Sequence, residues 1–336
     1  MRAAVLKELG RIEVIDTSMP QITEETQVQV RVRAVGICGT DLHMFREPRK
    51  DVTLPRIMGH ELSGEVTAVG TGVTSFKTGD RVVLDPVFAC GECPTCRKGY
   101  HNVCEKVRCY GVQMDGGFQD YIVVDEKHLS RFSEQISFEQ AALAEPFSIA
   151  SNMLDRAGLR ESENVLIFGC GTIGLAVLTV AKSLGARIMV TDVVSKKLEL
   201  AAGMGAAKAV NRKEQDLDDA AAAFAPGGFD VVIDAVGITT VFEKAVLYAA
   251  PRGRIVCIGF SDEPARLAPG TITRKELTIV GSRMNCHRFP IVMDWLNRGK
   301  ISADAMISKV FPVERIQEAF EATLADPASV KTIITF

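Results

Sequence analysis

The stretch VLIFGCGTIGLAVLTVAKSLG, residues 165–185, decides the fold. An apolar run of strand length leads into a glycine-rich turn, and a helix-forming run of leucine, alanine and valine follows. In the turn, Gly169, Gly171 and Gly174 form the pattern G-x-G-x-x-G. Glycines at these positions allow a tight turn and a close approach of the backbone to a pyrophosphate, which then lies at the positive N-terminus of the helix. The stretch therefore predicts a strand, turn and helix that bind a dinucleotide.

The next apolar stretch, RIMVTD, ends at Asp192, where a carboxylate accepts hydrogen bonds from the adenosine ribose hydroxyls. The same carboxylate repels the 2′-phosphate of NADP, so NAD is favoured, although Lys196 or Lys197 can offset part of that repulsion. The alternative is a glycine turn in an α/β sheet without any ligand. The residues predicted to bind NAD are Gly169, Gly171, Thr172, Ile173, Gly174, Asp192, Lys197, Gly237 and Gly259.

The chain around this stretch divides into three segments. Residues 1–148 hold short alternating runs, such as VQVRVRAV and DRVVLDP, which are typical of an antiparallel, barrel-like domain. Residues 149–283 alternate apolar strands with alanine-rich helical runs, the pattern of a parallel, doubly wound α/β sheet. Residues 284–336 carry helices near IVMDWLNRG and VERIQEAFEATL and end in the strand-like VKTIITF. Further strands of the middle segment are expected at 230–237, 253–260 and 277–283.

Composition agrees with a two-domain enzyme, since 336 residues exceed what one hydrophobic core usually supports. With a net charge of −3, the chain has no excess of basic residues that would attract nucleic acid or an anionic membrane. The N-terminus MRAAVLKELG does not resemble a secretory signal. Nine cysteines without such a signal favour the reducing cytoplasm and metal binding over disulfides. We therefore expect a cytoplasmic protein that binds a small molecule, without a nucleic-acid or membrane partner.

Four cysteines follow one another in CGECPTCRKGYHNVC, residues 90–104, with the spacing C-x2-C-x2-C-x7-C. Four such thiolates close a tetrahedral shell around one zinc ion and leave no position for a substrate, so this metal is predicted to be structural. Other cysteines and histidines carry no ligand spacing and are predicted to be buried small side chains or bystanders. The structural ligands are Cys90, Cys93, Cys96 and Cys104, and the bystanders are His101, Cys109, His128, Cys170, Cys257, Cys286 and His287.

A second metal site is indicated by GICGTDLH at 36–43 together with GHE at 59–61. Cys38, His60 and Glu61 supply sulfur, nitrogen and oxygen, a mixed set suited to a catalytic zinc ion that keeps one coordination position open.

With these motifs, the chain resembles the zinc-dependent medium-chain dehydrogenases of the alcohol, sorbitol and threonine dehydrogenase kind. The resemblance covers essentially all 336 residues: the ligand motif GICGTD…GHE, the four-cysteine lobe, the glycine fingerprint and the domain order. It implies a GroES-like β-barrel catalytic domain, to which residues 284–336 return, and a Rossmann domain that binds NAD. It also implies two zinc ions per chain and a homodimer or homotetramer.

The resemblance further implies roles for residues near the catalytic zinc. Thr40 resembles the hydroxyl that receives the substrate proton, which then passes through the cofactor ribose to His43 and out to solvent. Asp41 is similar to the carboxylate that orients the histidine ligand. Glu145 matches a further glutamate near the metal in the polyol branch, so it is expected as a fourth zinc ligand. The alternatives are a turn histidine at position 43 and an ordinary helix-start acid at 145.

Glu61 adjoins His60, and either it or water completes the zinc shell. Zinc held by Cys38 and His60 is expected to polarise a substrate hydroxyl and to lower the pKa of that hydroxyl.

The segment TRKELTIVGSRMNCHRFPIVMDWLNRGKI, residues 273–301, is the most informative for the substrate. Arg283 is expected to pair with a carboxylate, and Asn285 to donate to hydroxyls. The alternative is that Arg283 orders its loop or holds a water network at the metal. The segment most resembles bacterial sugar-acid dehydrogenases that oxidise C5 of hexonates such as L-galactonate or L-gulonate. We thus predict NAD-dependent oxidation of a hexonate, with a neutral polyol such as sorbitol second and threonine third.

Two other classes of protein compete with an enzyme. A zinc-stabilised nucleotide sensor without catalysis would bind NAD in the same cleft, but it would have no need of Cys38, Thr40, His60 and Glu61 together. A nucleic-acid-binding zinc ribbon is disfavoured by the acidic balance and by the lack of basic flanks around the lobe.

Overall fold

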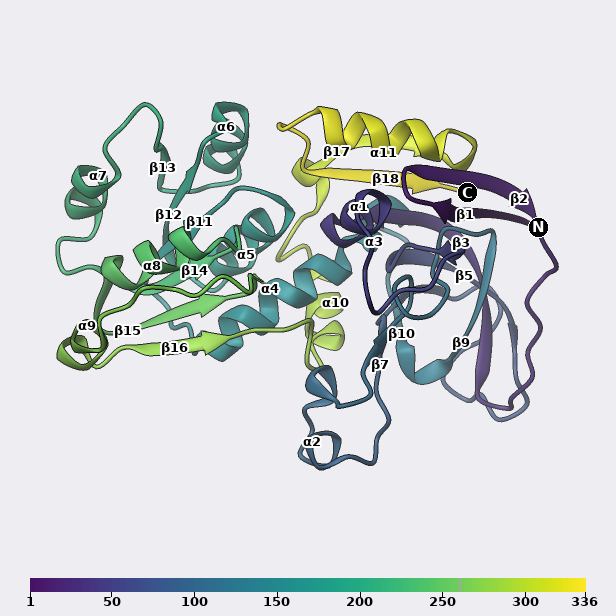
Figure 1. The fold of residues 1–336 in the computed structure, drawn as a ribbon. Helices are drawn as coiled ribbons and strands as arrows, with labels where there is room; N and C mark the ends of the chain where they lie inside the picture. The colour runs from purple at the N-terminus through teal and green to yellow at the C-terminus, as the bar shows by residue number, and fades with distance from the viewer. Residues whose placement is uncertain (260) are drawn as a thin grey trace. The chain divides into compact units, whose positions relative to one another are not determined.

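The computed structural model, described at residues 1–259 and 261–336, consists of two compact units (Figure 1). Unit 1 is formed by Met1–Glu145 and Asn285–Phe336, and unit 2 by Pro146–Met284. The chain therefore changes units after residues 145 and 284, where the sequence suggested 148 and 283. The first change falls inside a helix, so no loop or linker marks it in the sequence. Phe260, the last residue of the strand expected at 253–260, lies outside the described residues.

Unit 2 contains a six-stranded sheet in the order β13-β12-β11-β14-β15-β16, and every neighbouring pair in it is parallel. Helices connect the successive strands, so the unit is doubly wound. The strands are β11 Asn164–Phe168, β12 Arg187–Asp192, β13 Lys208–Asn211, β14 Phe229–Asp234, β15 Ala249–Cys257 and β16 Thr278–Gly281. The helices are α4 Ala144–Ala157, α5 Thr172–Ser183, α6 Ser195–Gly203, α7 Leu217–Phe224, α8 Thr239–Tyr248 and α9 Pro269–Lys275.

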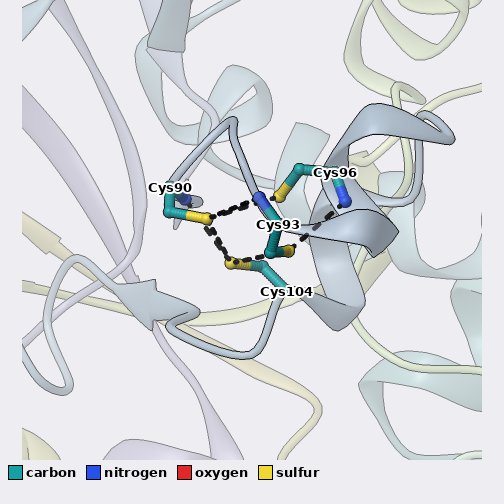
Figure 2. A group of neighbouring side chains, drawn as sticks. All are labelled: Cys90, Cys93, Cys96 and Cys104. Atoms are coloured by element: carbon teal, nitrogen blue, oxygen red, sulfur yellow. Dashed lines mark hydrogen bonds between the residues drawn. The ribbon is translucent and has the colours of Figure 1, made fainter.

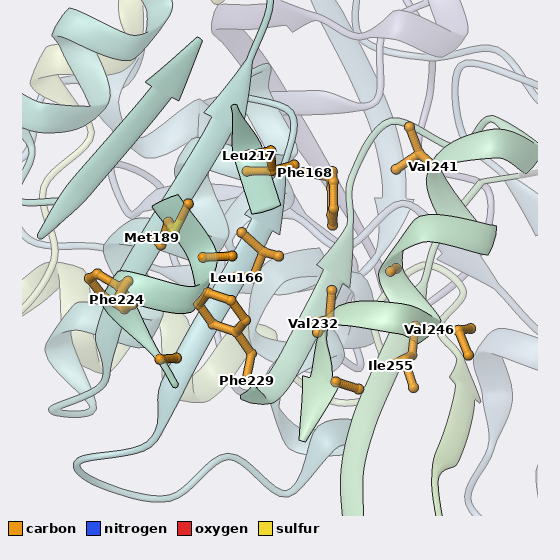
Figure 3. Close-up of a cluster of buried hydrophobic side chains, with 14 of the residues drawn as sticks. Leu166, Phe168, Met189, Leu217, Phe224, Phe229, Val232, Val241, Val246 and Ile255 are labelled. Carbon is orange, nitrogen blue, oxygen red and sulfur yellow. The ribbon is translucent and has the colours of Figure 1, made fainter. Parts of the chain in front are cut away.

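One face of this sheet packs against α7 and α8, as the cluster in Figure 3 shows. Leu166 and Phe168 of β11 are at most 1% exposed, because a parallel strand is covered on both faces and carries a continuous apolar run. Phe224 of α7 stacks on Phe229 of β14, with ring centroids 5.9 Å apart and planes 15° apart. Each large apolar side chain buried in this way contributes about 1.5–3 kcal/mol. The buried apolar runs hold the strands in place, and the glycine-rich turn directly follows one of them, β11.

Unit 1 is built on a seven-stranded sheet with the path β10-β6-β5-β3-β18-β17, and β9 pairs with β3 off this path. β17 and β18 are parallel to each other, whereas the other pairs of this sheet are antiparallel. A three-stranded sheet, β2-β1-β4, and the small β7-β8 pair complete the strands. The strands are β1 Arg2–Glu8, β2 Arg11–Asp16, β3 Gln27–Ile37, β4 Arg56–Ile57, β5 Glu61–Val69, β6 Arg81–Leu84, β7 Val87–Phe88, β8 Arg108–Cys109, β9 Tyr121–Asp125, β10 Leu129–Arg131, β17 Ile307–Pro312 and β18 Lys331–Thr335.

The helices of unit 1 are short and lie at the ends of strands. Two of them, α10 and α11, lie where the sequence pattern predicts helices near the C-terminus. The α-helices are α1 Gly39–Arg46, α2 Pro94–Arg97, α3 Phe138–Ala142, α10 Phe289–Asn297 and α11 Ile316–Ala325, and the 3-10 turns are η1 His101–Val103, η2 Glu126–His128, η3 Asp304–Met306 and η4 Val313–Arg315. Among the described residues, no helix combines the length and the apolar character needed to cross a bilayer.

Strand β18 brings the C-terminal segment of the chain into the unit 1 sheet, between β3 and β17. It pairs antiparallel with β3, with Thr332 opposite Ile37 and Ile333 opposite Gly36. On its other edge β3 pairs with β5, where Gly36 lies opposite Glu61. Since β3 also leads directly into α1, this three-strand arrangement gathers the residues of the candidate site.

Candidate active site

Asp41 joins the segment that follows β3 to the segment that precedes β5. Its Oδ2 accepts the backbone N–H of Cys38 at 2.9 Å, and its Oδ1 accepts that of Gly59 at 3.3 Å. Cys38 is the N-cap of α1, and the Asp41 side chain closes the capping box. The carboxylate is fully buried, and burial raises the pKa of Asp41. One buried side chain thus ties together the two backbone segments that carry Cys38 and His60.

The ligand atoms of Cys38, His60 and Glu61 all lie within 4.8 Å of one another. His60 is 6% exposed, and its Nδ1 lies 3.7 Å from Asp41 Oδ1 without a hydrogen-bond partner. Burial opposes a protonated ring, but the charges of Cys38 and Asp41 outweigh it and raise the pKa of His60 well above its ordinary value. A buried group of anions around an imidazole with an unpartnered nitrogen has the donor set and the charge that a zinc ion requires.

Lys331, the first residue of β18, holds the Glu61 carboxylate. Its Nζ donates to both carboxylate oxygens, at 2.5 and 2.7 Å, and to Ile37 O at 3.0 Å. Both side chains of the pair are 1% exposed. Burial disfavours the charge on Lys331, but Glu61 and then Cys38 outweigh it and raise the pKa of Lys331. A Cβ on Gly36 would lie 2.1 Å from Glu61 Oε2, so the glycine in β3 provides the space for this carboxylate.

Sequence reasoning missed Lys331, because this lysine belongs to no recognised motif. The available signal was its position: Lys331 opens the buried strand KTIIT, where a charged residue requires a partner.

Glu145 and Cys109 lie on the border of the same cluster. Burial raises the pKa of Glu145 to about 7, while the charge of His60 opposes the shift and that of Glu61 adds to it. The group of ligand atoms within 4.8 Å does not include Glu145, and its role as a further zinc ligand stays a prediction. Cys109 is influenced by His60 and Glu145, and burial raises its pKa to about 12. It therefore lies towards this cluster and is not a member of the four-cysteine group.

Thr40 and His43 lie one turn apart on α1, a helix that the sequence did not predict. Thr40 is half-buried and His43 is exposed to solvent. The helix starts at the Cys38 cap, so Thr40 and His43 follow closely after a predicted zinc ligand.

The four predicted lobe ligands form one cluster (Figure 2). Cys90 Sγ lies 3.5 Å from Cys104 Sγ and 4.0 Å from Cys96 Sγ, and Cys93 Sγ lies 3.9 Å from Cys104 Sγ. Backbone N–H groups point at the sulfurs, for example Cys96 N to Cys93 Sγ at 3.4 Å. Such donors stabilise thiolates, and they lower the pKa of Cys93 to about 6. The cluster fits a structural zinc ion with all four positions filled by sulfur.

In unit 2, glycine is required at each position of the G-x-G-x-x-G turn for a different structural reason. Gly169 adopts φ 93°, which only glycine adopts readily, and ends β11 in a tight turn. A Cβ on Gly171 would meet no atom within 4 Å, so the backbone there is open to a ligand. A Cβ on Gly174 would lie 1.8 Å from Gly169 O, so the helix packs directly on the turn. Thr172 and Ile173 form the first turn of α5, where a pyrophosphate binds.

Asp192 ends β12 beside this turn. Its Oδ2 accepts the Cys170 N–H at 2.6 Å, and its Oδ1 accepts the Val193 N–H at 2.6 Å. Lys197 is half-buried in α6, the helix that follows. The carboxylate is thus fixed at the carboxyl edge of the sheet, where the adenosine ribose binds in this fold.

Gly237 and Gly259 contact each other beyond the carboxyl ends of β14 and β15. A Cβ on Gly259 would lie 2.1 Å from Gly237 Cα. Both glycines line a cavity of about 210 Å³, together with Thr239 and Ser261. A cavity at the carboxyl ends of parallel strands is where ligands bind in such sheets.

The two predicted substrate residues differ in environment. Arg283 is half-buried in unit 2, in a loop to which Asn152 donates through Nδ2, at 3.0 Å to Met284 O. Asn285 begins the second part of unit 1, is fully buried, and donates through Nδ2 to Asp85 Oδ1 at 3.0 Å. This bond uses one of the amide hydrogens of Asn285, and its role towards a substrate hydroxyl stays a prediction.

Two family models match the chain. One describes the alcohol dehydrogenase GroES-like domain and matches residues 24–134. The other describes the zinc-binding dehydrogenases and matches residues 172–298. The predicted fold class, a GroES-like domain combined with a Rossmann-type domain, is thereby confirmed.

Several curated relatives cover almost the whole chain. The starvation-sensing protein RspB of Escherichia coli K12 is 35% identical, over 100% of this chain and 99% of its own length. A solved structure of rspB from E. coli CFT073, complexed with NADH, matches with a TM-score of 0.94 and 34% identity, over 100% of this chain and 99% of that chain. D-altritol 5-dehydrogenase of Agrobacterium fabrum is 37% identical over 90% of each chain. L-galactonate-5-dehydrogenase of E. coli K12 is 31% identical, over 94% of this chain and 93% of its own length.

The matches span both domains, and both metal clusters and the glycine turn lie within or beside the matched ranges. The chain therefore belongs to the zinc-dependent medium-chain alcohol dehydrogenase family and is an oxidoreductase that uses zinc and a nicotinamide dinucleotide.

Proposed function

We propose that this protein oxidises the C5 hydroxyl of a sugar acid of the L-galactonate or L-gulonate type to the keto acid and transfers the hydride to NAD. The observation that carries the proposal is the buried group of Cys38, His60 and Glu61, whose sulfur, nitrogen and oxygen ligand atoms lie within 4.8 Å of one another. A mixed ligand set of this kind suits a catalytic zinc ion with an open position, and an all-sulfur shell does not.

Cys38 and His60 would hold the catalytic zinc ion, with Glu61 or water completing the shell and Glu145 beside it. Bound zinc supplies Lewis acidity that lowers the pKa of a coordinated hydroxyl. Lys331 keeps the Glu61 carboxylate oriented, since it donates to both of its oxygens.

Protons leave the site along α1. Thr40, which is half-buried, would accept the proton of the substrate hydroxyl while it releases its own hydroxyl proton, and His43, one turn later and exposed, would pass a proton to solvent. Asp41 holds the start of this helix and the His60 segment in place through its two backbone hydrogen bonds.

NAD is held by the glycine turn and by Asp192 in unit 2. The carboxylate of Asp192 disfavours the 2′-phosphate of NADP, and two of its acceptor sites already bind the backbone at 2.6 Å, so it cannot turn away. A structure of the related rspB holds NADH, which agrees with this preference.

The proposal that the substrate is an acid rests on Arg283. A guanidinium group pairs with a carboxylate through two parallel hydrogen bonds. The names of two relatives agree on the position of attack and differ on the charge of the substrate: L-galactonate is an acid, and D-altritol is neutral. The second candidate substrate is therefore a neutral hexitol, favoured by the 37% identity to D-altritol 5-dehydrogenase.

NAD reduction by the zinc-loaded enzyme, with matched pairs of hexonates and hexitols, tests the choice. We expect higher kcat/KM for the acid and a selective loss of that preference in Arg283→Ala. Arg298→Ala, which removes an exposed i,i+4 pair with Asp294, serves as the control. Equal or faster turnover of the hexitols by the wild type would move the protein to the neutral-polyol function.

We further propose that the protein acts in the cytoplasm as a homodimer or homotetramer. All nine cysteines are free thiols in the structure, which suits a reducing compartment. The oligomer is proposed from the family resemblance.

A further inference from the structure

Three metal-binding side chains that neither zinc cluster uses come together in unit 1. His101 lies in η1, within the four-cysteine lobe, whereas Cys286 and His287 lie just before α10. Their ligand atoms all lie within 4.8 Å of one another. His101 Nδ1 is 3.3 Å from His287 Nε2, and the ring centroids are 4.3 Å apart. Two imidazoles and a thiol thus point at one small volume.

The carbonyl oxygen of Gly99 faces the same volume. It lies 3.0 Å from His287 Nε2 and 3.4 Å from Cys286 Sγ. The complete donor set is therefore two nitrogens, one sulfur and one oxygen.

The backbone also suits metal binding. His287 adopts φ 55°, a left-handed conformation that a residue with a Cβ keeps only where its surroundings hold it.

We propose that His101, Cys286, His287 and the Gly99 carbonyl form a third metal site, which takes a divalent transition ion of the zinc class. Imidazole and thiolate ligands select zinc, cobalt or nickel over magnesium or calcium, which prefer oxygen. His101 and Cys286 are half-buried and His287 is exposed, so the ion exchanges with solution, in contrast to one enclosed by the four cysteines.

A bound ion would join the lobe to the segment that leads into α10. His101 and His287 are 186 residues apart in sequence, so the metal would close a long loop of chain that includes all of unit 2. Asn285, which is fully buried and bonded to Asp85, already anchors this segment on its other side. A bound ion would therefore stabilise the lobe.

Zinc binding to the enzyme with both other sites filled tests the proposal. After equilibrium dialysis against micromolar zinc, metal analysis should give three equivalents for the wild type and two for Cys286→Ser and His287→Asn. Asparagine is chosen at position 287 because it tolerates the left-handed conformation. Cys257→Ser, a cysteine outside all three clusters, is the matched control and should keep three.

A second measurement covers variants that fold poorly. Cobalt added to the wild type with its two zinc sites filled should give a thiolate charge-transfer band, and Cys286→Ser should lack that band. Zinc should also raise the thermal midpoint of the wild type and leave that of Cys286→Ser unchanged. Two equivalents and no cobalt band in the wild type, or a third equivalent that survives in both variants, would overturn the proposal.

Discussion

Replacing Lys331 by methionine would leave the Glu61 carboxylate buried without the cation that holds it. Lys331 and Glu61 are each 1% exposed, and Nζ lies 2.5 and 2.7 Å from the two carboxylate oxygens. Removing one partner of a buried ion pair costs about 3–5 kcal/mol, because the other charge stays buried and uncompensated. The lost bond to Ile37 O adds to this cost, since that carbonyl also lies inside the sheet. We expect the free energy of unfolding of unit 1 to fall by about 4 kcal/mol.

Urea unfolding followed by the fluorescence of Trp295 measures this loss, because the single tryptophan of the chain lies in α10 of unit 1. Lys309→Met is the matched control. Lys309 pairs with Asp326 at 2.9 Å on the surface, at 26% and 41% exposure, and such a pair contributes about 0–1 kcal/mol. The double variant Glu61→Gln with Lys331→Met should recover part of the loss, since it leaves no unpaired charge. A cost in Lys331→Met no larger than that in Lys309→Met would refute the reasoning.

Three further predictions follow from the lobe and the glycine turn. Cys93→Ser should lower the zinc content by one equivalent and reduce the thermal midpoint, while the zinc held by Cys38 and His60 is retained. Asp192→Ser should raise the kcat/KM ratio of NADP to NAD by at least about tenfold, equivalent to about 1.4 kcal/mol, because it removes the charge that repels the 2′-phosphate; an unchanged ratio would count against that role. Gly174→Ala should destabilise unit 2, since its Cβ would lie 1.8 Å from a backbone oxygen, whereas Gly171→Ala, with no atom within 4 Å, should fold normally and lose NADH affinity in a fluorescence titration. Equal thermal midpoints for the two glycine variants would contradict this assignment.

The features that could be predicted from the sequence are those whose residues lie close together along the chain. The strand, turn and helix at 165–185 appear as β11, the glycine turn and α5, because each glycine has a local steric reason. The lobe cysteines come together because three of them are separated by two residues each, which is the reach of a tight metal-binding turn. Neither feature depends on the rest of the fold.

The features that sequence could not predict depend on pairings between distant segments. Lys331 reaches Glu61 only because β18 inserts beside β3, a register that no local pattern encodes. His101 and His287 were interpreted as bystanders, since their contact requires the lobe to fold back on the segment before α10. The helix α1 was also missed, because its start depends on a cysteine cap and on Asp41, and a hydrophobic period reveals neither. The bond between Asn285 and Asp85 joins segments 200 residues apart and could not be predicted either.

The central claim is that the group of Cys38, His60 and Glu61 is where oxidation occurs. The most direct test is turnover and NADH binding measured together on Cys38→Ser, with Arg298→Ala, which removes an exposed surface pair, as the control. We predict that Cys38→Ser loses NAD reduction with every hexonate and hexitol tested, while its NADH dissociation constant stays within about twofold of the wild type, which is about 0.4 kcal/mol. Full turnover in Cys38→Ser would place the chemistry elsewhere, and a wild type that binds NADH but reduces NAD with none of these substrates would contradict the account in favour of a nucleotide sensor.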